Sequence, residues 1–306
     1  MTDTIARLRA GRRIWVIASV HGVAPRLAAL AARIEARLQP RDAMVFMGNL
    51  VGGAPGGEPS DVAATLDIAL KLRRTLLAGP GARACDVAFL RGAQEEMWSK
   101  LDQLHFAVNP RDVLRWMLHH GVGATIEAYV GRDAIGEGLR AVGAGPMMTA
   151  RWIGALRDAV RRHAGHEPLY NSVKRAALSE DGRLLFVNHG VDPSKPLERQ
   201  GDSFWWGAPQ PFERIAEPFA GIEARRARLR SRTSGGRHRC RRPDRRCRLR
   251  LRRPIARAAA RSRRPRARAH RGLNTQCGSN WTTAQASAKL ICSLKERDQQ
   301  WPSSTF

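Results

Sequence analysis

Short apolar runs that alternate with amphipathic stretches constrain the fold of the first two hundred residues. The runs cover residues 13–19, 43–48, 86–92 and 183–190, and they are rich in β-branched and aromatic residues. Runs of this length and composition predict buried strands. Helical periodicity between them predicts helices over residues 25–39 and 61–77. The alternation indicates an α/β sandwich, with a mostly parallel or mixed sheet and flanking helices.

The first predicted helix illustrates the pattern. It would begin at Pro25, because the fixed φ of proline suits the first helical turn, and it would end before Pro40. Apolar residues spaced three or four apart predict one buried face. That face would consist of Leu27, Leu30, Ile34 and Leu38.

Residues from about 95 to 180 carry helical spacing and no clear strand, so they predict a helical insertion. Trp98, Leu101 and Leu104 would share one apolar stripe. Leu114, Met117 and Leu118 would share another. We expect a turn at residues 143–146 and a single domain over residues 1–224 that contains this insertion.

Polar clusters directly follow the predicted strands. In open α/β sheets, ligands bind at the carboxyl ends of the strands. These ends carry Ser19–His21, Gly48–Asn49, Arg91–Glu95 and Asn188–Gly190. A functional site is therefore expected where the four clusters meet.

The order and spacing of the clusters resemble the calcineurin-like metallophosphoesterases, in the branch of bacterial serine/threonine-type phosphatases. That family carries D-x-H-G, G-D-x-x-D-R-G, R-G-N-H-E and H-A-G after successive strands. This chain reads S-V-H-G at 19–22, G-N-L-V-G-G-A at 48–54, R-G-A-Q-E at 91–95 and N-H-G at 188–190. L-F-V-N-H-G-V-D-P-S-K-P-L at 185–197 and F-W-W-G at 204–207 are also similar to that branch, and the resemblance covers about residues 12–222.

The resemblance implies a two-metal phosphoesterase site with most of its ligands replaced. The family's chemistry uses two divalent cations roughly 3.5–4 Å apart. His21 keeps a metal-ligand position and is a vestigial ligand. The other positions hold Ser19 for aspartate, Asn49 for the bridging aspartate, and Asn188 for histidine. Ala93 replaces a further ligand, an asparagine.

The remaining family positions bear on catalysis. Gln94 replaces the histidine that donates a proton to the leaving group, and glutamine cannot titrate. Gly52 and Gly53 replace an aspartate–arginine pair that helps hold the phosphate. Arg91 is retained and, by the resemblance, binds substrate. We therefore assign no catalytic residue, and we expect no resident cofactor and a residual role in binding a phosphorylated ligand or a protein.

An active phosphatase with an altered site is the alternative. It would hold divalent manganese, iron or zinc in a site rebuilt from His21, His189, Glu95 and Glu96. Side chains alternate along a strand, so His189 should point away from Asn188. This geometry weighs against the rebuilt site.

The carboxyl-terminal part differs in composition from the rest. Residues 225–306 carry 25 basic and 3 acidic residues, whereas residues 1–224 carry 28 and 24. The stretch 225–271 holds 22 arginines and no lysine, with Asp244 as its only acid. Such a stretch cannot bury a core, so it predicts disorder. It could also bind nucleic acid non-specifically, as a second alternative function.

The absence of lysine favours another origin for this tail. A GC-rich gene read out of frame encodes arginine, alanine and proline in this way. With permitted codons, a shift of one nucleotide near Ala224 yields a segment similar to the family's glycine-rich closing strand, and later a stop. We interpret residues 225–306 as a frameshift product, which would leave one edge of the sheet unpaired.

Two further expectations concern location and metals in the tail. The sequence has no run of eighteen apolar residues, so no membrane span is expected, and its start lacks the features of a secretory signal. A cytoplasmic location follows by default. Four of the five cysteines lie after residue 225, at spacings that fit no zinc motif.

Overall fold

Two β-sheets form the centre of the fold. The structure is a computed structural model that describes residues 4–54, 57–207 and 224–226. All of these residues belong to one compact unit. The first sheet has the order β2-β3-β4 and is parallel, with β2 at Ile14–Ile17, β3 at Ala43–Phe46 and β4 at Val87–Phe89. The second sheet has the order β1-β5-β6-β7. Its strands are Ile5–Leu8, Ala176–Ser179, Leu184–Phe186 and Ala224–Arg226. Only β5 and β6 pair antiparallel in it.

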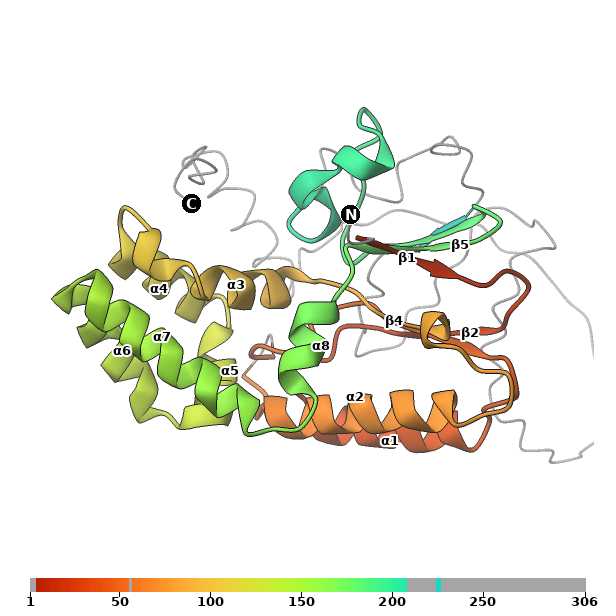
Figure 1. The fold of residues 1–306 in the computed structure, drawn as a ribbon, viewed down its shortest axis with the longest axis horizontal. Coiled ribbons are helices and arrows are strands. Elements are labelled where there is room, and N and C mark those ends of the chain that lie inside the picture. The colour runs from red at the N-terminus through yellow and green to blue at the C-terminus, as the bar shows by residue number, and fades with distance from the viewer. Residues whose placement is uncertain (1–3, 55–56, 208–223, 227–306) are drawn as a thin grey trace, which may run out of the picture. The chain divides into compact units, whose positions relative to one another are not determined.

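The alternation of side chains along β3 explains the layers. Val45 and Met47 pack with residues of β1, β5 and β6 between the two sheets. Met44 and Phe46 face the other way and pack against α1 (Ala24–Glu35) and α2 (Val62–Leu77). Figure 1 shows these two helices side by side along the outer face of the first sheet. The predicted α/β sandwich with flanking helices is confirmed.

Helix α1 departs from its prediction at two places. It ends at Glu35 and not at the residue before Pro40, and Leu30 is 39% exposed. The buried stripe contains Leu27 and Ile34 but is narrow, because the helix packs on one side only. Leu30 lies just beyond its edge.

The insertion consists of helices α3 (Ala93–Leu101), α4 (Pro110–His119), α5 (Val122–Val130), α6 (Asp133–Ala144), α7 (Pro146–Arg161) and α8 (His166–Ser172). They enclose their own apolar core, which includes Leu101, Leu114 and Met117. The predicted turn at 143–146 separates α6 from α7. The predicted end near 180 is wrong, because Ala176–Ser179 forms β5.

Strands β1, β5 and β7 were not predicted. Strand β7 corrects the start of the predicted disordered tail, because residues 225 and 226 pair with β6. An edge strand presents unpaired N–H and C=O groups, so a neighbouring segment can pair along it. The rest of the predicted tail lies outside the described residues.

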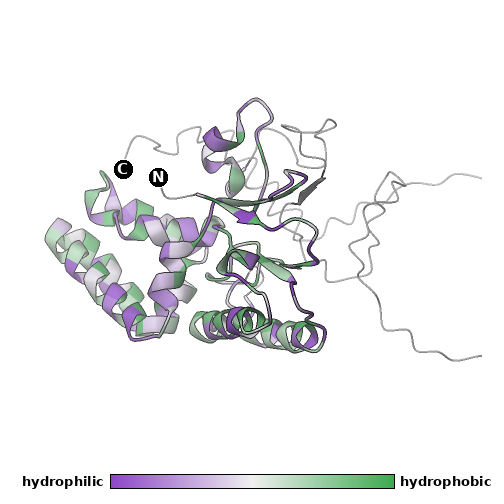
Figure 2. Cartoon of the chain, turned by 45° about the vertical axis from the view of Figure 1, so that its right-hand side comes forward, coloured by the Kyte–Doolittle hydropathy of each residue, from purple (hydrophilic) through white to green (hydrophobic). Residues whose placement is uncertain are grey.

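The described helices carry both hydrophobic and hydrophilic residues (Figure 2). Within the described ranges, no helix is long and apolar enough to cross a membrane.

Candidate functional site

The candidate site is a set of side chains at the carboxyl ends of the strands: Ser19, His21, Asn49, Gln94 and Asn188. We call it the strand-end cluster. Its first two segments are joined through the backbone, since the N–H groups of Val20 and His21 donate to the Asn49 carbonyl at 3.0 and 2.8 Å. His21 and Asn49 adopt positive φ angles of 53° and 52°. Such strained conformations concentrate at functional sites.

The Asn49 amide lies at the centre of the cluster and is 1% exposed. Its Oδ1 accepts from the backbone N–H of Gln94 at 3.0 Å, and its Nδ2 donates to Ser19 Oγ at 3.4 Å. A Cβ atom on Gly92 would lie 2.3 Å from Asn49 Oδ1. Only glycine at position 92 therefore lets the third segment approach this closely.

Asn188 connects the end of β6 to the end of β3. Its Nδ2 donates to the Met47 carbonyl at 2.6 Å. Its Oδ1 is buried and accepts no hydrogen bond from the part of the chain that the structure describes. The next residue, His189, is exposed. The structure thus brings the four predicted segments together, while the roles of their residues stay predictions.

Glu95 holds the backbone of the cluster in place. It is 4% exposed, and its carboxylate accepts backbone N–H groups from Asn49 at 2.7 Å, Leu50 at 2.8 Å and Gly92 at 2.9 Å. Burial raises the pKa of the Glu95 carboxyl, and these N–H groups oppose the shift. Because both carboxylate oxygens already accept these bonds, Glu95 does not suit the role of metal ligand in the alternative site.

Gln94 fills the space beside Gly52. A Cβ atom on Gly52 would lie 2.0 Å from Gln94 Oε1. Gln94 Nε2 donates to the His120 carbonyl at 2.7 Å, which fixes the amide against the end of α4. The Gly53 N–H also donates to the Gly121 carbonyl, at 2.8 Å. The helical insertion therefore holds the loop that contains Gly52 and Gly53 in place. In the sequence, the only sign of this contact is the glycines at the positions where the two segments meet.

Arg91 contacts Glu96 of helix α3 and Trp205, which follows β6 in the sequence. Its Nη1 is 2.8 Å from Glu96 Oε2, and its guanidinium carbon lies 5.9 Å from the Trp205 ring centroid. The guanidinium of Arg175 also lies over Trp205, at 5.7 Å. These contacts turn Arg91 toward α3 and the segment after β6.

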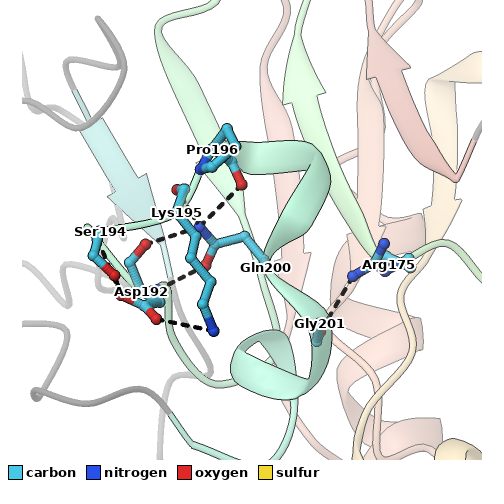
Figure 3. Close-up of polar contacts among 7 residues, drawn as sticks. All are labelled: Arg175, Asp192, Ser194, Lys195, Pro196, Gln200 and Gly201. Atoms are coloured by element: carbon cyan, nitrogen blue, oxygen red, sulfur yellow. Dashed lines mark hydrogen bonds and ion pairs between the residues drawn. The ribbon is translucent and has the colours of Figure 1, made fainter.

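The loop after β6 is built around Gln200, which is 1% exposed (Figure 3). Its Oε1 accepts from the Asp192 N–H at 2.6 Å, and its Nε2 donates to the Asp192 and Lys195 carbonyls at 2.9 and 2.7 Å. Arg175 donates to the Gly201 carbonyl at 3.2 Å (Figure 3). This network places Phe204 and Trp205 against the second sheet.

The side chains present do not fit a pair of divalent cations. Two such ions repel strongly at short range unless carboxylates compensate their charge. The bridging position holds Asn49, whose amide already bonds to Gln94 and Ser19. Within residues 4–54, 57–207 and 224–226, no three His, Cys, Asp or Glu side chains gather in a way that could hold a metal.

The solved structures to which this chain is similar include two phosphatases. One is assigned as a diadenosine tetraphosphatase, at 13% identity and a TM-score of 0.33, over 65% of this chain and 60% of that one. The other is a protein serine/threonine phosphatase from Saccharomyces cerevisiae with similarity to human phosphatase PP5, at 15% identity and a TM-score of 0.33, over 68% and 50%. The chain thus spans less than two thirds of either protein. No family model and no curated protein matches.

Proposed function

We propose that this chain is a phosphoesterase-like domain of the calcineurin-like kind, which binds a phosphorylated ligand or protein and hydrolyses it little or not at all. The main support for this proposal is that the four motif segments, which lie far apart in the sequence, contact one another in the fold. Asn49 reaches Ser19 and Gln94 directly, and Asn188 bonds to the Met47 carbonyl beside it. The segments keep the family order described above.

Weak or absent hydrolysis follows from the chemistry of the same side chains. A leaving alkoxide needs a proton, and Gln94 cannot supply one. Asn49 offers a neutral amide where the family has a bridging carboxylate. The Gln94 side chain also occupies the space beside Gly52, where the family carries an aspartate.

Binding would use the groups that remain. Ser19 and His21 would contact a phosphoryl group, and the Arg91 guanidinium would offset its charge from the neighbouring segment. Asn49 would position Ser19 through the amide contact at 3.4 Å. Cleavage is not required for such a role.

The test of catalysis is turnover of a generic phosphomonoester with manganese supplied, beside elemental analysis of the purified protein. We expect turnover no faster than a blank. Restoring aspartate at Ser19 and Asn49 together should not recover it, because Gln94 still cannot protonate a leaving group. Two bound metals per chain, with turnover lost in His21→Ala, would instead establish the active phosphatase with an altered site.

The test of binding is a titration with a phosphoserine peptide and its unphosphorylated counterpart. Ser19→Ala should weaken binding of the phosphorylated form. Ser172→Ala is the matched control, because Ser172 is exposed and its hydroxyl bonds to the Leu169 carbonyl within α8. Equal binding of both peptides, or equal effects of the two substitutions, would contradict the proposal.

A further inference from the structure

Two turns of the helical insertion expose large apolar side chains to solvent. Phe106 is 73% exposed, Val108 is 81% exposed and Met147 is 83% exposed. Met148, the next residue, is 43% exposed. We call these four residues the apolar tip. Single exposed apolar residues are common, whereas a group of them marks a surface that interacts with another protein or with a membrane.

Contacts within the insertion bring the two turns of the apolar tip together. Residues 106–108 precede α4, and residues 147–148 lie in the first turn of α7. Helices α4, α6 and α7 pack together in the insertion (Figure 1). Arg111, at the start of α4, reaches the end of α6, because a Cβ atom on Gly143 would lie 3.0 Å from Arg111 Nη2. The four side chains therefore come from adjacent turns and form one patch.

Two arginines that form no ion pair within the described ranges flank this patch. Arg111 and Arg151 are both exposed. Arg151 follows Met147 by four residues on α7, so the two side chains share one face of the helix. Long arginine side chains can lie along apolar surface while their guanidinium groups reach polar surroundings.

Acidic residues are scarce beside the apolar tip. Residues 103–116 and 141–151 contain three arginines and one acidic residue, Asp112. Asp112 Oδ2 accepts a hydrogen bond from Asn109 Nδ2 at 2.6 Å, and its Oδ1 lies 3.9 Å from Arg115 Nη1. The charge around the apolar tip is therefore positive and complements an anionic surface.

We propose that the apolar tip inserts into an anionic lipid surface, with Arg111 and Arg151 bound to lipid phosphates. Side chains that are exposed by more than two thirds on two turns protrude, and a fluid lipid interface accepts protruding side chains without a matching pocket. Anionic headgroups attract arginines beside the inserted residues. Docking of this kind needs no helix that crosses the bilayer. The proposal does not depend on phosphoryl binding at the strand-end cluster.

The experiment is cosedimentation of the full chain with vesicles of phosphatidylcholine mixed with phosphatidylglycerol. We expect the double variant Val108→Gln and Met147→Gln to bind about tenfold or more weakly, because both side chains lose apolar burial. The matched control is Leu30→Gln with Val130→Gln, since these residues are exposed but lie outside the apolar tip. Residues 227–306 are the same in every variant, so their basic charge contributes equally.

A second pair of variants tests the contribution of charge. Arg111→Gln with Arg151→Gln should weaken binding to the mixed vesicles about tenfold or more. Arg33→Gln with Arg74→Gln is the matched control, because these exposed arginines on α1 and α2 give the same change in net charge. Vesicles of phosphatidylcholine alone should bind the wild-type chain more weakly than the mixed vesicles.

A third variant tests insertion directly. Phe106→Trp should gain fluorescence that brominated phosphatidylcholine in the mixed vesicles quenches. Three results would overturn the proposal: no sedimentation with the mixed vesicles, equal affinity of either double variant and its control, or no added quenching in Phe106→Trp. An apolar tip that serves a protein partner would give the second of these results.

Discussion

At the residue scale, Gln94 and Gly52 depend on each other. The amide of Gln94 lies where a side chain at position 52 would begin, and Gln94 is 7% exposed and bonded to the His120 carbonyl. Any side chain at position 52 must displace this amide. The loss of Gln94 would in turn leave a gap beside the loop that contains Gly52.

Gly52→Ala should therefore destabilise the chain for two reasons. The residue has a φ of +81°, which disfavours a Cβ atom, and the new methyl group would break the Gln94 hydrogen bond. Gly57→Ala is the matched control, since Gly57 has a φ of +76° with nothing near its Cβ position. We expect Gly52→Ala to cost about 1 kcal/mol more than the control in urea unfolding. Adding Gln94→Ala should remove most of this excess, and equal costs for both glycines would refute the clash.

At the element scale, a hydrogen-bond chain through a buried histidine joins three helices. His166 on α8 is fully buried, and its Nδ1 lies 2.8 Å from the Tyr129 hydroxyl on α5. Its Nε2 lies 3.1 Å from Asp67 Oδ1 on α2. His163 stacks on the same ring at 5.1 Å. The insertion is thus tied to α2 through one imidazole.

Acidification should weaken this connection. Burial lowers the pKa of His166 below its usual range, His163 adds to the shift, and Asp67 opposes it. The unfolded chain then binds the proton more readily, so stability is full above a pH of about 6.5 and is lost as pH falls below it. The thermal midpoint should drop between about pH 7.5 and about pH 5.5, and drop less in His166→Gln. Exposed His119→Gln is the control; an unchanged pH profile in His166→Gln would contradict this assignment.

At the scale of the whole molecule, the charge is divided unevenly along the chain. Residues 225–306 carry 25 basic and 3 acidic residues, and nearly all of them lie outside the described part. Two explanations lead to different measurements. Either the reading frame changes near Ala224, or the arginines serve a binding function.

The gene itself tests the first explanation. We expect that a shift of one nucleotide near the Ala224 codon opens a frame that encodes a glycine-rich closing motif and then a stop. The reason is the absence of lysine among the 22 arginines of residues 225–271. Sequencing of this region decides the matter. An early stop in the shifted frame would rule the frameshift out and favour a selected basic arm.

Salt dependence tests the second explanation. The full chain should bind duplex DNA of any sequence, and its affinity should fall steeply with added salt, because arginines release counterions from phosphates. A chain ending at residue 226 should lose this binding. Sequence-selective binding that persists at high salt would contradict the expectation. A measurement at several salt concentrations on two unrelated duplexes separates these outcomes.

The sequence by itself determined the elements whose signals are local. Buried runs marked β2, β3, β4 and β6, and Asp61 marked the start of α2, where it caps the Ala64 N–H at 2.9 Å. The motif positions of Ser19, Asn49 and Asn188 were likewise readable in the chain. Local patterns suffice here because burial and capping depend on near neighbours in sequence.

Only the tertiary structure decided which distant segments meet. Strands β1 and β5 are four residues long and lie far apart in the sequence, and each is stabilised by its pairing with the other. Contacts between distant segments also set the positions of two side chains at the site. The Glu95 carboxylate accepts hydrogen bonds from the N–H groups of Asn49 and Leu50, and the Gln94 side chain packs against Gly52. The apolar tip also depends on helix packing, because its two turns come from different parts of the insertion. Periodicity specifies which face of an element is buried, but the partner of that face is set by packing and hydrogen bonding across the whole fold.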